Sequence, residues 1–326
     1  MNSLNPKVFD EDVEQVAIRT GFGEGFLLAG KDNPNVVGLC ADLIESTKMN
    51  LFKEAFPERF IEVGVAEQNL ASVASGMAAM GKIPFISSYA MFSPGRNWEQ
   101  IRTTICYNNV NVKIAGSHAG VSVGPDGGTH QALEDIAITR VLPRMIVISP
   151  CDAIEAKKAT LAASMVVGPT YIRLAREKTP VITTEETPFE IGKARIFYQG
   201  KKTATVGIIA TGALVHKALL AARQLEDDGI SVRVLNLSTI KPLDENAIIS
   251  VARETRAIVT VEEHQTIGGM GSAVAEFLAR TYPVRMGFIG VDDQFGQSGK
   301  PDELIAYYGM GVESIVAKVR EICQRK

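Results

Sequence analysis

The sequence predicts an α/β fold made of two three-layer domains, each built around a parallel sheet. Short apolar runs rich in β-branched residues alternate with longer segments of helical period, which is the pattern of parallel strands joined by crossover helices. The alternation occurs in two blocks with an interruption between them. A length of 326 residues suits two domains, and a hydrophobic content of 46% is enough for a well-filled core.

The first block is expected to begin with a helix and to continue with alternating strands and helices. The helix would start at Asp10 or Glu11 and carry an apolar stripe through Val16 and Ala17. Segment 69–80 is so rich in Ala, Ser and Gly that its backbone can approach a neighbour closely, and packing is its default interpretation. The predicted strands lie near 35–40, 59–63, 83–87, 111–116, 145–149 and 170–174.

A cluster of Pro and Thr residues between Pro180 and Pro188 interrupts the pattern, as a linker or edge segment would. We therefore expect one domain over 1–188 and a second, smaller domain over 189–326. The strands of the second block are predicted near 205–212, 231–237, 257–262 and 284–289. Helices are expected between them and after Gly311.

Composition and charge argue against several classes of protein. A formal net charge of −3 gives no global reason to bind nucleic acid or an anionic membrane. The four cysteines are widely scattered, which indicates reduced thiols in a cytoplasmic protein rather than disulfides or a metal knuckle. The sequence shows neither a secretion signal nor about 18 uninterrupted apolar residues, so export and membrane insertion are not expected.

Residues that follow the strands of the first block are candidates for a site, because ligands bind beyond the carboxyl ends of parallel strands. These positions hold carboxylates, aromatic rings, histidines and arginines that would converge on one rim of the sheet. They are Asp42, Ser46, Glu67, Tyr89, Phe92, His118, Asp126, His130 and Arg176, with Arg173 inside the last strand.

Each of these residues also has a structural interpretation. Glu67 could complement the positive end of a helix dipole, and Asp42 could belong to a turn. Tyr89 and Phe92 could be core residues on one face, and the GPDGG sequence at 124–128 could be only a turn. A single histidine is more often structural than catalytic. The joint placement on one rim is what favours a functional site.

Several stretches of the chain resemble the transketolase family in order and spacing. The similarity extends over almost the whole chain, and specifically to the C-terminal portion that two-gene transketolases encode separately. The second block resembles the family's C-terminal domain. The matching stretches of the first block are ADLIEST at 41–47, FPERFIEVGVAEQNLAS at 56–72, KIPFISSYAMF at 82–92, GGTHQALEDIA at 127–137 and PTYIRLAREKTPVI at 169–182.

The resemblance implies a pyrimidine-binding domain for thiamine diphosphate. Glu67 matches the glutamate that contacts the aminopyrimidine ring and promotes its imino tautomer, an acid–base role worth roughly 10²–10⁴-fold. Tyr89 and Phe92 match the aromatic wall of that pocket. Asp42 matches an aspartate near the cofactor, and Arg96 is a further cofactor-side candidate.

The resemblance also implies substrate-facing residues and a reaction. A two-carbon ketol unit would pass from a ketose phosphate to an aldose phosphate, as in the pentose phosphate pathway. His118 and His130 match groups that transfer protons to and from sugar oxygens, and Asp126 faces the sugar. The sugar phosphate would be held by Arg19, Ser46 and Arg176, with Arg173 as a further candidate. Pro125 stands where related enzymes carry an acidic residue, which leaves sugar selectivity open.

The family's magnesium motif is missing from this sequence. Transketolases hold the diphosphate through Mg²⁺ on a GDG motif followed by an asparagine, and the chain contains no GDG. We therefore expect no metal ligands here, and an N-terminal partner subunit that carries the motif in an α2β2 assembly.

Three other interpretations stay open. The chain could be the β subunit of a 2-oxoacid dehydrogenase, a fragment similar to deoxyxylulose-phosphate synthase, or a noncatalytic scaffold. In the second block, His264 beside two glutamates is expected to be structural. The glycine run Gly268–Gly271 is only a weak indication of a phosphate site.

Overall fold

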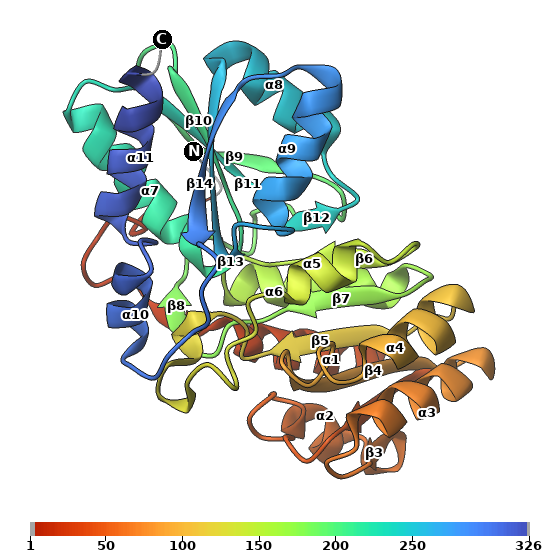
Figure 1. Cartoon of the computed structure of the whole chain (residues 1–326). Helices are drawn as coiled ribbons and strands as arrows, with labels where there is room; N and C mark the ends of the chain where they lie inside the picture. Colours follow the sequence, from red (N-terminus) through yellow and green to blue (C-terminus); the bar gives the residue numbers. More distant parts are fainter. Residues whose placement is uncertain (1–3, 325–326) are drawn as a thin grey trace.

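A computed structural model describes residues 4–324, and within these residues the first half is built on a seven-stranded sheet (Figure 1). Its first six strands in sequence order, β2 to β7, run parallel, and β12 joins one edge antiparallel. Across the sheet the order is β12 (Thr239–Lys241), β6 (Ile146–Ile148), β7 (Thr170–Arg173), β5 (Lys113–Ser117), β4 (Ile83–Tyr89), β2 (Val36–Cys40) and β3 (Phe60–Glu62).

Helices cover both faces of this sheet. On one face, α1 (Ile18–Asp32) packs on α6 (Ala153–Met165), and a Cβ on Gly21 would lie 1.8 Å from the carbonyl oxygen of Ala153, so only glycine permits this approach. On the other face, α3 (Glu67–Ala79) packs beside the helical turn η2 (Ile101–Tyr107). Shorter helices are α2 (Asn50–Ala55), α4 (Trp98–Gln100), α5 (Asp135–Arg140), and the turns η1 (Pro57–Arg59) and η3 (Val121–Asp126).

The second half has a five-stranded sheet among the described residues. In Figure 1, α7 and α11 lie on one side of it and α8 and α9 on the other. The strand order is β14 (Arg285–Val291), β13 (Ala257–Gln265), β10 (Val206–Ala210), β11 (Val232–Asn236) and β9 (Arg195–Gln199), the last antiparallel. The helical elements are η4 (Gly212–Leu214), α7 (Val215–Asp227), α8 (Glu245–Thr255), α9 (Met270–Thr281), α10 (Pro301–Tyr307) and α11 (Val312–Gln324).

Two buried apolar clusters extend across both halves. One buried cluster joins Val121 and Leu133 of the first half to side chains of α7 and β10. A second joins Met145 and Val147 to Ile240 and Ile248 of the second half. Because neither core is confined to one half, groups of the second half can fix loops of the first.

Each predicted strand is present, but the structure corrects the first helix. Residues Gln15–Ala17 form a strand, β1, that pairs antiparallel with β8 (Lys178–Pro180), so the helix begins at Ile18 rather than near residue 10. The apolar residues at 16 and 17 therefore belong to a strand. Strands β9 and β12 were not predicted. The domain boundary near 188 stays a prediction, since β8 ends at 180 and β9 begins at 195.

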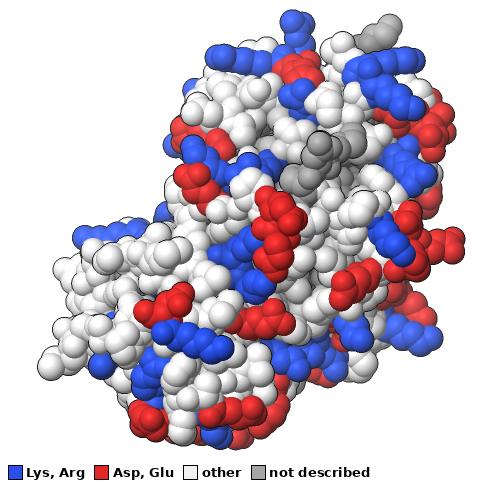
Figure 2. All heavy atoms as spheres, turned by 180° about the vertical axis from the view of Figure 1, so that it is seen from behind, with Lys and Arg blue, Asp and Glu red and all other residues white. Residues whose placement is uncertain are grey.

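The surface mixes charges of both signs. Figure 2 shows acidic and basic side chains interspersed over the face opposite to that of Figure 1, with few charges on the side that carries α3 and α4. None of the helices within residues 4–324 combines the length and apolar character needed to cross a bilayer.

Candidate functional site

Glu67 is a buried carboxylate at the wall of a cavity. It is the first residue of α3, so its side chain lies where the helix dipole favours negative charge, and it is only 4% exposed. The cavity of about 460 Å³ is also lined by Phe92 and Arg96. No group within residues 4–324 donates a hydrogen bond to the Glu67 carboxylate. A buried carboxylate without a protein donor is available to a ligand that offers a polar hydrogen.

Asn97 holds the two walls of this cavity together. Its side-chain amide donates hydrogen bonds to the backbone oxygen of Glu67 at 2.9 Å and to Ser93 Oγ at 3.2 Å. Asn97 is fully buried, and it follows the aromatic stretch by a few residues. The sequence patterns did not single it out, because no periodicity or motif marks a residue that bonds a backbone oxygen thirty positions away.

Tyr89, Phe92, His118 and His130 form a cluster of rings at the ends of β4 and β5. The Tyr89 and His118 rings are stacked with centroids 3.8 Å apart, and Phe92 contacts His130 edge to face at 5.4 Å. The Tyr89 and Phe92 centroids lie 6.1 Å apart. Four residues predicted to converge therefore do lie together, as the carboxyl ends of neighbouring parallel strands require.

His118 sits in a strongly positive environment. It is 2% exposed, and its Nδ1 lies 2.8 Å from Ser117 Oγ. Burial, followed by the nearby charges of Arg19 and Arg176, lowers the pKa of His118 to about 3. Both protonation forms were expected to be accessible at this position. A pKa this low favours the neutral imidazole at physiological pH, a form that can still bond a ligand, and the proton transfer expected of His118 stays a prediction.

The residues expected to hold a sugar phosphate are linked to one another. Arg19 donates from Nε to the backbone oxygen of Arg176 at 3.1 Å, and from Nη1 to the backbone oxygen of Ser46. Arg176 bonds the backbone oxygen of Val123 and lies 3.8 Å from Asp126 Oδ1. Burial and the neighbouring Arg176 lower the pKa of Arg19. Because the charge of Arg176 acts on Arg19, an anion that contacts either guanidinium would be favoured.

Asp42 is positioned by a residue that the sequence analysis missed. The backbone N–H groups of Asp42 and Gly64 both donate to Glu62 Oε1, at 2.7 and 2.8 Å. Asp42 is exposed and has a φ of 60°, which aspartate tolerates better than most residues. Glu62 therefore ties the loop after β2 to the loop that precedes Glu67.

Arg173 does not lie with Arg19 and Arg176, the other two arginines predicted to bind the sugar phosphate. Its guanidinium is 6% exposed, and Nε donates to Asp135 Oδ2 at 2.8 Å. Its Nη2 donates to the backbone oxygen of Glu263 at 2.7 Å. Arg173 was predicted to contact the substrate, but its guanidinium is already bonded inside the protein. The Arg173 side chain points between the two halves rather than toward the rim.

In the second half, His264 and the glycine run Gly268–Gly271 have surroundings that suit a structural role. His264 is fully buried, and burial lowers its pKa to about 4. The Gly268–Gly271 run does open a helix, but the carboxylate of Glu262 accepts the N–H groups of Met270 and Gly271, both at 2.7 Å. A side chain of the protein therefore occupies the position that a phosphate would take.

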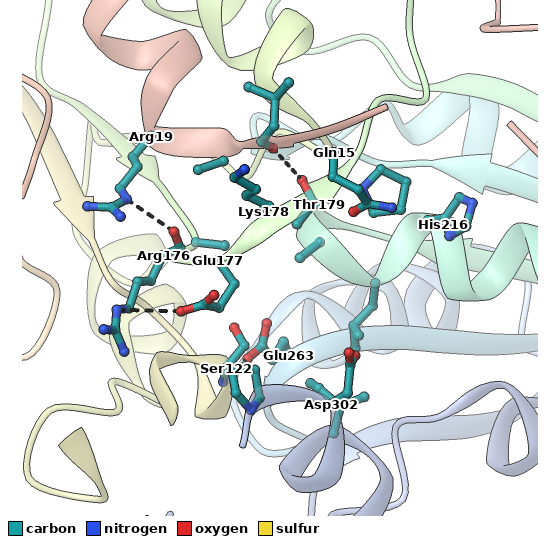
Figure 3. A pocket seen from close by; sticks show the side chains of 18 of the residues that line it. Gln15, Arg19, Ser122, Arg176, Glu177, Lys178, Thr179, His216, Glu263 and Asp302 are labelled. Atoms are coloured by element: carbon teal, nitrogen blue, oxygen red, sulfur yellow. Dashed lines mark hydrogen bonds and ion pairs between the residues drawn. The ribbon is translucent and has the colours of Figure 1, made fainter. Parts of the chain in front are cut away.

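A larger cavity, about 1150 Å³, lies between the two halves (Figure 3). Arg19, Arg176 and Lys178 of the first half and His216 and Asp302 of the second line it. Within residues 4–324, His, Cys, Asp and Glu side chains form no group of three arranged to hold a metal ion.

Comparison with protein families and solved structures gives a consistent result. Residues 14–181 match the transketolase pyrimidine binding domain, and residues 192–315 match the transketolase C-terminal domain. The chain is 45% identical to a Methanocaldococcus jannaschii protein described as a transketolase C-terminal section, across 93% of this chain and 95% of that protein. It is 39% identical to a 6-deoxy-6-sulfo-D-fructose transketolase subunit from a Clostridium species, across 98% of both chains.

Among solved structures, a split-gene transketolase described as an inactive β4 tetramer superposes with a TM-score of 0.88. That chain is 44% identical, and the match covers 94% of this chain and 98% of the other. The similarity therefore extends through both halves of the chain.

Proposed function

Because the chain belongs to the transketolase family, as the section that split transketolases encode separately, we propose that it is the C-terminal subunit of a two-chain transketolase. With a partner subunit it transfers a two-carbon ketol unit from a ketose phosphate to an aldose phosphate. The observation that carries this proposal is the buried Glu67 carboxylate, which has no donor among the described residues and faces the cavity shared with Phe92.

The cavity fits the aminopyrimidine of thiamine diphosphate. An aromatic ring, a buried carboxylate and the Arg96 guanidinium line it, so a flat heterocycle could stack on Phe92 and share a proton with Glu67. When bound, thiamine diphosphate would supply the nucleophilic chemistry that ketol transfer needs. Glu67 would hold the proton at the pyrimidine ring nitrogen, and Asp42 would border the cofactor at the subunit contact.

The other half of the cofactor site is assigned to a partner. The sequence lacks the GDG motif that would bind the diphosphate through Mg²⁺. Several apolar side chains of the first half are exposed, among them Val65 (78%), two residues before Glu67, and Tyr107 (79%) at the end of η2. Such residues suit burial against another subunit. The partner would be the N-terminal subunit with the GDG…N motif, in an α2β2 assembly.

The substrate residues divide into two groups. Asp126 and His130 would bond the sugar hydroxyls, with His130 moving protons and neutral His118 orienting the sugar. Arg19, Ser46 and Arg176 would hold the phosphate, because the mutual repulsion of the two arginines is relieved when an oxyanion binds. We assign Arg173 to support of the loop rather than to the substrate.

The β4 tetramer described as inactive supports the need for a partner, since that chain resembles this one along its whole length. The chain's free cysteines suit a reducing compartment, and we place the enzyme in the cytoplasm. A relative named for a sulfonated ketose makes a specialised sugar a substrate to include in any test.

The test is coexpression with the GDG-bearing subunit, followed by assays with thiamine diphosphate and Mg²⁺. Donors would include ketose phosphates and 6-deoxy-6-sulfo-D-fructose, each with a panel of aldose acceptors. We expect ketol transfer without pyruvate, by the pair and not by either chain alone. Oxidation of pyruvate with a lipoyl acceptor would indicate a dehydrogenase subunit, and condensation of pyruvate with glyceraldehyde phosphate a deoxyxylulose-phosphate synthase. The complete absence of turnover would favour a scaffold.

A further inference from the structure

We propose that Glu263, in the second half, is a positioning residue for the substrate loop, defined here as residues 120–130. Through this loop it would set how Asp126 and His130 meet the sugar. The proposal rests on the function proposed above for those two residues. It gives the C-terminal domain a role in substrate binding in addition to any role in assembly.

The contact between Glu263 and the loop is direct. Glu263 lies on β13 and is 3% exposed. Its Oε1 accepts the backbone N–H of Ser122, at the start of η3, at 2.7 Å. Figure 3 shows Ser122 and Glu263 side by side at the wall of the interdomain cavity. A buried hydrogen bond to a charged acceptor is among the stronger ones a protein makes.

Gly120 shows that the loop is built around this carboxylate. A Cβ added at Gly120 would lie 2.3 Å from Glu263 Oε1, and the residue has a φ of 92°. Only glycine combines this backbone conformation with such a close approach. The loop therefore turns directly on the carboxylate, and a shift of that group would displace both Gly120 and Ser122.

Further hydrogen bonds hold the backbone of Glu263 in place and attach the substrate loop to the second half. Arg173 bonds the backbone oxygen of Glu263, which holds this end of β13 against the first half. Gln131 donates to the backbone oxygens of Val121 and Gln297, both at 3.0 Å, and so ties the loop to the segment before α10. Burial raises the pKa of Glu263, and the charge of Arg173 opposes that rise.

The neighbouring glutamate supplies a matched control. Consecutive side chains on a strand point to opposite faces, and Glu262 is directed at the N-terminus of α9 instead of at the loop. Both carboxylates are buried and both accept backbone N–H groups. They differ in their partners: Glu263 accepts an N–H group of the substrate loop, whereas Glu262 accepts N–H groups inside the second half.

The experiment compares Glu263→Ala, Glu263→Asp, Glu263→Gln and Glu262→Gln. Hydrogen–deuterium exchange on the full chain follows the amides of the substrate loop without requiring activity. In Glu263→Ala, loop exchange should accelerate about tenfold or more, the factor expected when a hydrogen bond to a charged acceptor is lost. Glu263→Gln keeps a hydrogen-bond acceptor, so its loop exchange rate should stay within about threefold of the wild-type rate. Glu263→Asp shortens the side chain by one methylene and so withdraws the carboxylate from the loop. If Glu263→Ala does not fold, Glu263→Asp is measured in its place.

In the reconstituted enzyme, Glu263→Ala should raise KM for the ketose donor by roughly tenfold to a hundredfold, because a small misplacement of binding groups is costly. The affinity for thiamine diphosphate should not change, since Glu67 and Phe92 are untouched. Glu262→Gln should lower Tm and leave both loop exchange and KM unchanged.

Loop exchange equal to wild type in Glu263→Ala or Glu263→Asp would overturn the positioning role. Faster exchange with an unchanged donor KM would overturn its link to the substrate. If the wild-type pair transfers no ketol unit, the proposed function fails instead, and the exchange measurement still decides whether Glu263 positions the loop.

Discussion

Tyr89 and His118 are stacked ring on ring, with centroids 3.8 Å apart and planes 23° from parallel. The imidazole is buried and lies near two arginines, so a third positive charge on His118 would be unfavourable. The site therefore concentrates positive charge on guanidinium groups, which suit phosphate, and favours a neutral imidazole at His118.

His118→Gln should change how stability depends on pH. The folded pKa of about 3 lies below the usual value, so the unfolded chain binds more protons between these two pKa values. The stability that comes from neutral His118 is complete above about pH 6.5 and decreases as pH falls, by at most about 1.4 kcal/mol per pH unit. The Tm advantage of wild type over His118→Gln should therefore shrink between about pH 7 and pH 5. Thermal unfolding at matched chain concentration measures this difference. A constant difference would show that folding does not lower the pKa of His118.

Glu67→Gln should abolish most of the activity of the two-chain enzyme while the protein stays folded. A glutamine can occupy the same space beside Phe92, but it cannot share a proton with a ring nitrogen. The turnover of the reconstituted pair should fall by about 10²–10⁴-fold. Steady-state ketol transfer and the Tm of the variant are the measurements. Glu58→Gln, an exposed residue of η1, is the control and should keep full activity. Unchanged turnover in Glu67→Gln would revive the scaffold interpretation.

Arg176→Ala should discriminate against phosphorylated sugars. A charge-assisted hydrogen bond is worth about 1.5–3 kcal/mol, so KM for a ketose phosphate should rise by about 10–150-fold. A ketose without phosphate should lose little, because it never makes this contact. Arg320→Ala removes a surface arginine paired with Asp228 and controls for the loss of charge. Equal losses for both kinds of donor would contradict a phosphate role for Arg176.

Most strands could be predicted from the sequence because their apolar runs are buried along the whole length, as in β2 and β10. Three of the missed strands, β1, β8 and β12, have three residues each and depend on distant partners. Lys241 of β12 pairs with Val147, and Val16 of β1 pairs with Thr179. A three-residue strand without a continuous apolar run has no local pattern to detect, so its existence depends on tertiary pairing.

The rim was predictable for a related reason, since the ends of parallel strands lie at one edge and so bring Tyr89 to His118. The direction of a side chain within a strand was harder to infer. Arg173 is three residues from Arg176, yet it points between the halves to Asp135. Glu263 lay in a stretch interpreted as structural, and only its contact with Ser122 connects it to the substrate loop.

Arg173→Met should destabilise the fold strongly. Its guanidinium and the Asp135 carboxylate form a buried ion pair at 2.8 Å, with side chains 6% and 1% exposed. Removing one partner of such a pair costs about 3–5 kcal/mol, because the other charge stays buried without compensation. The variant should therefore unfold at a clearly lower temperature, and adding Asp135→Asn should recover part of the loss, which a double-mutant cycle measures. If Arg173→Met keeps the wild-type Tm and only raises the KM for phosphorylated donors, the arginine binds substrate after all.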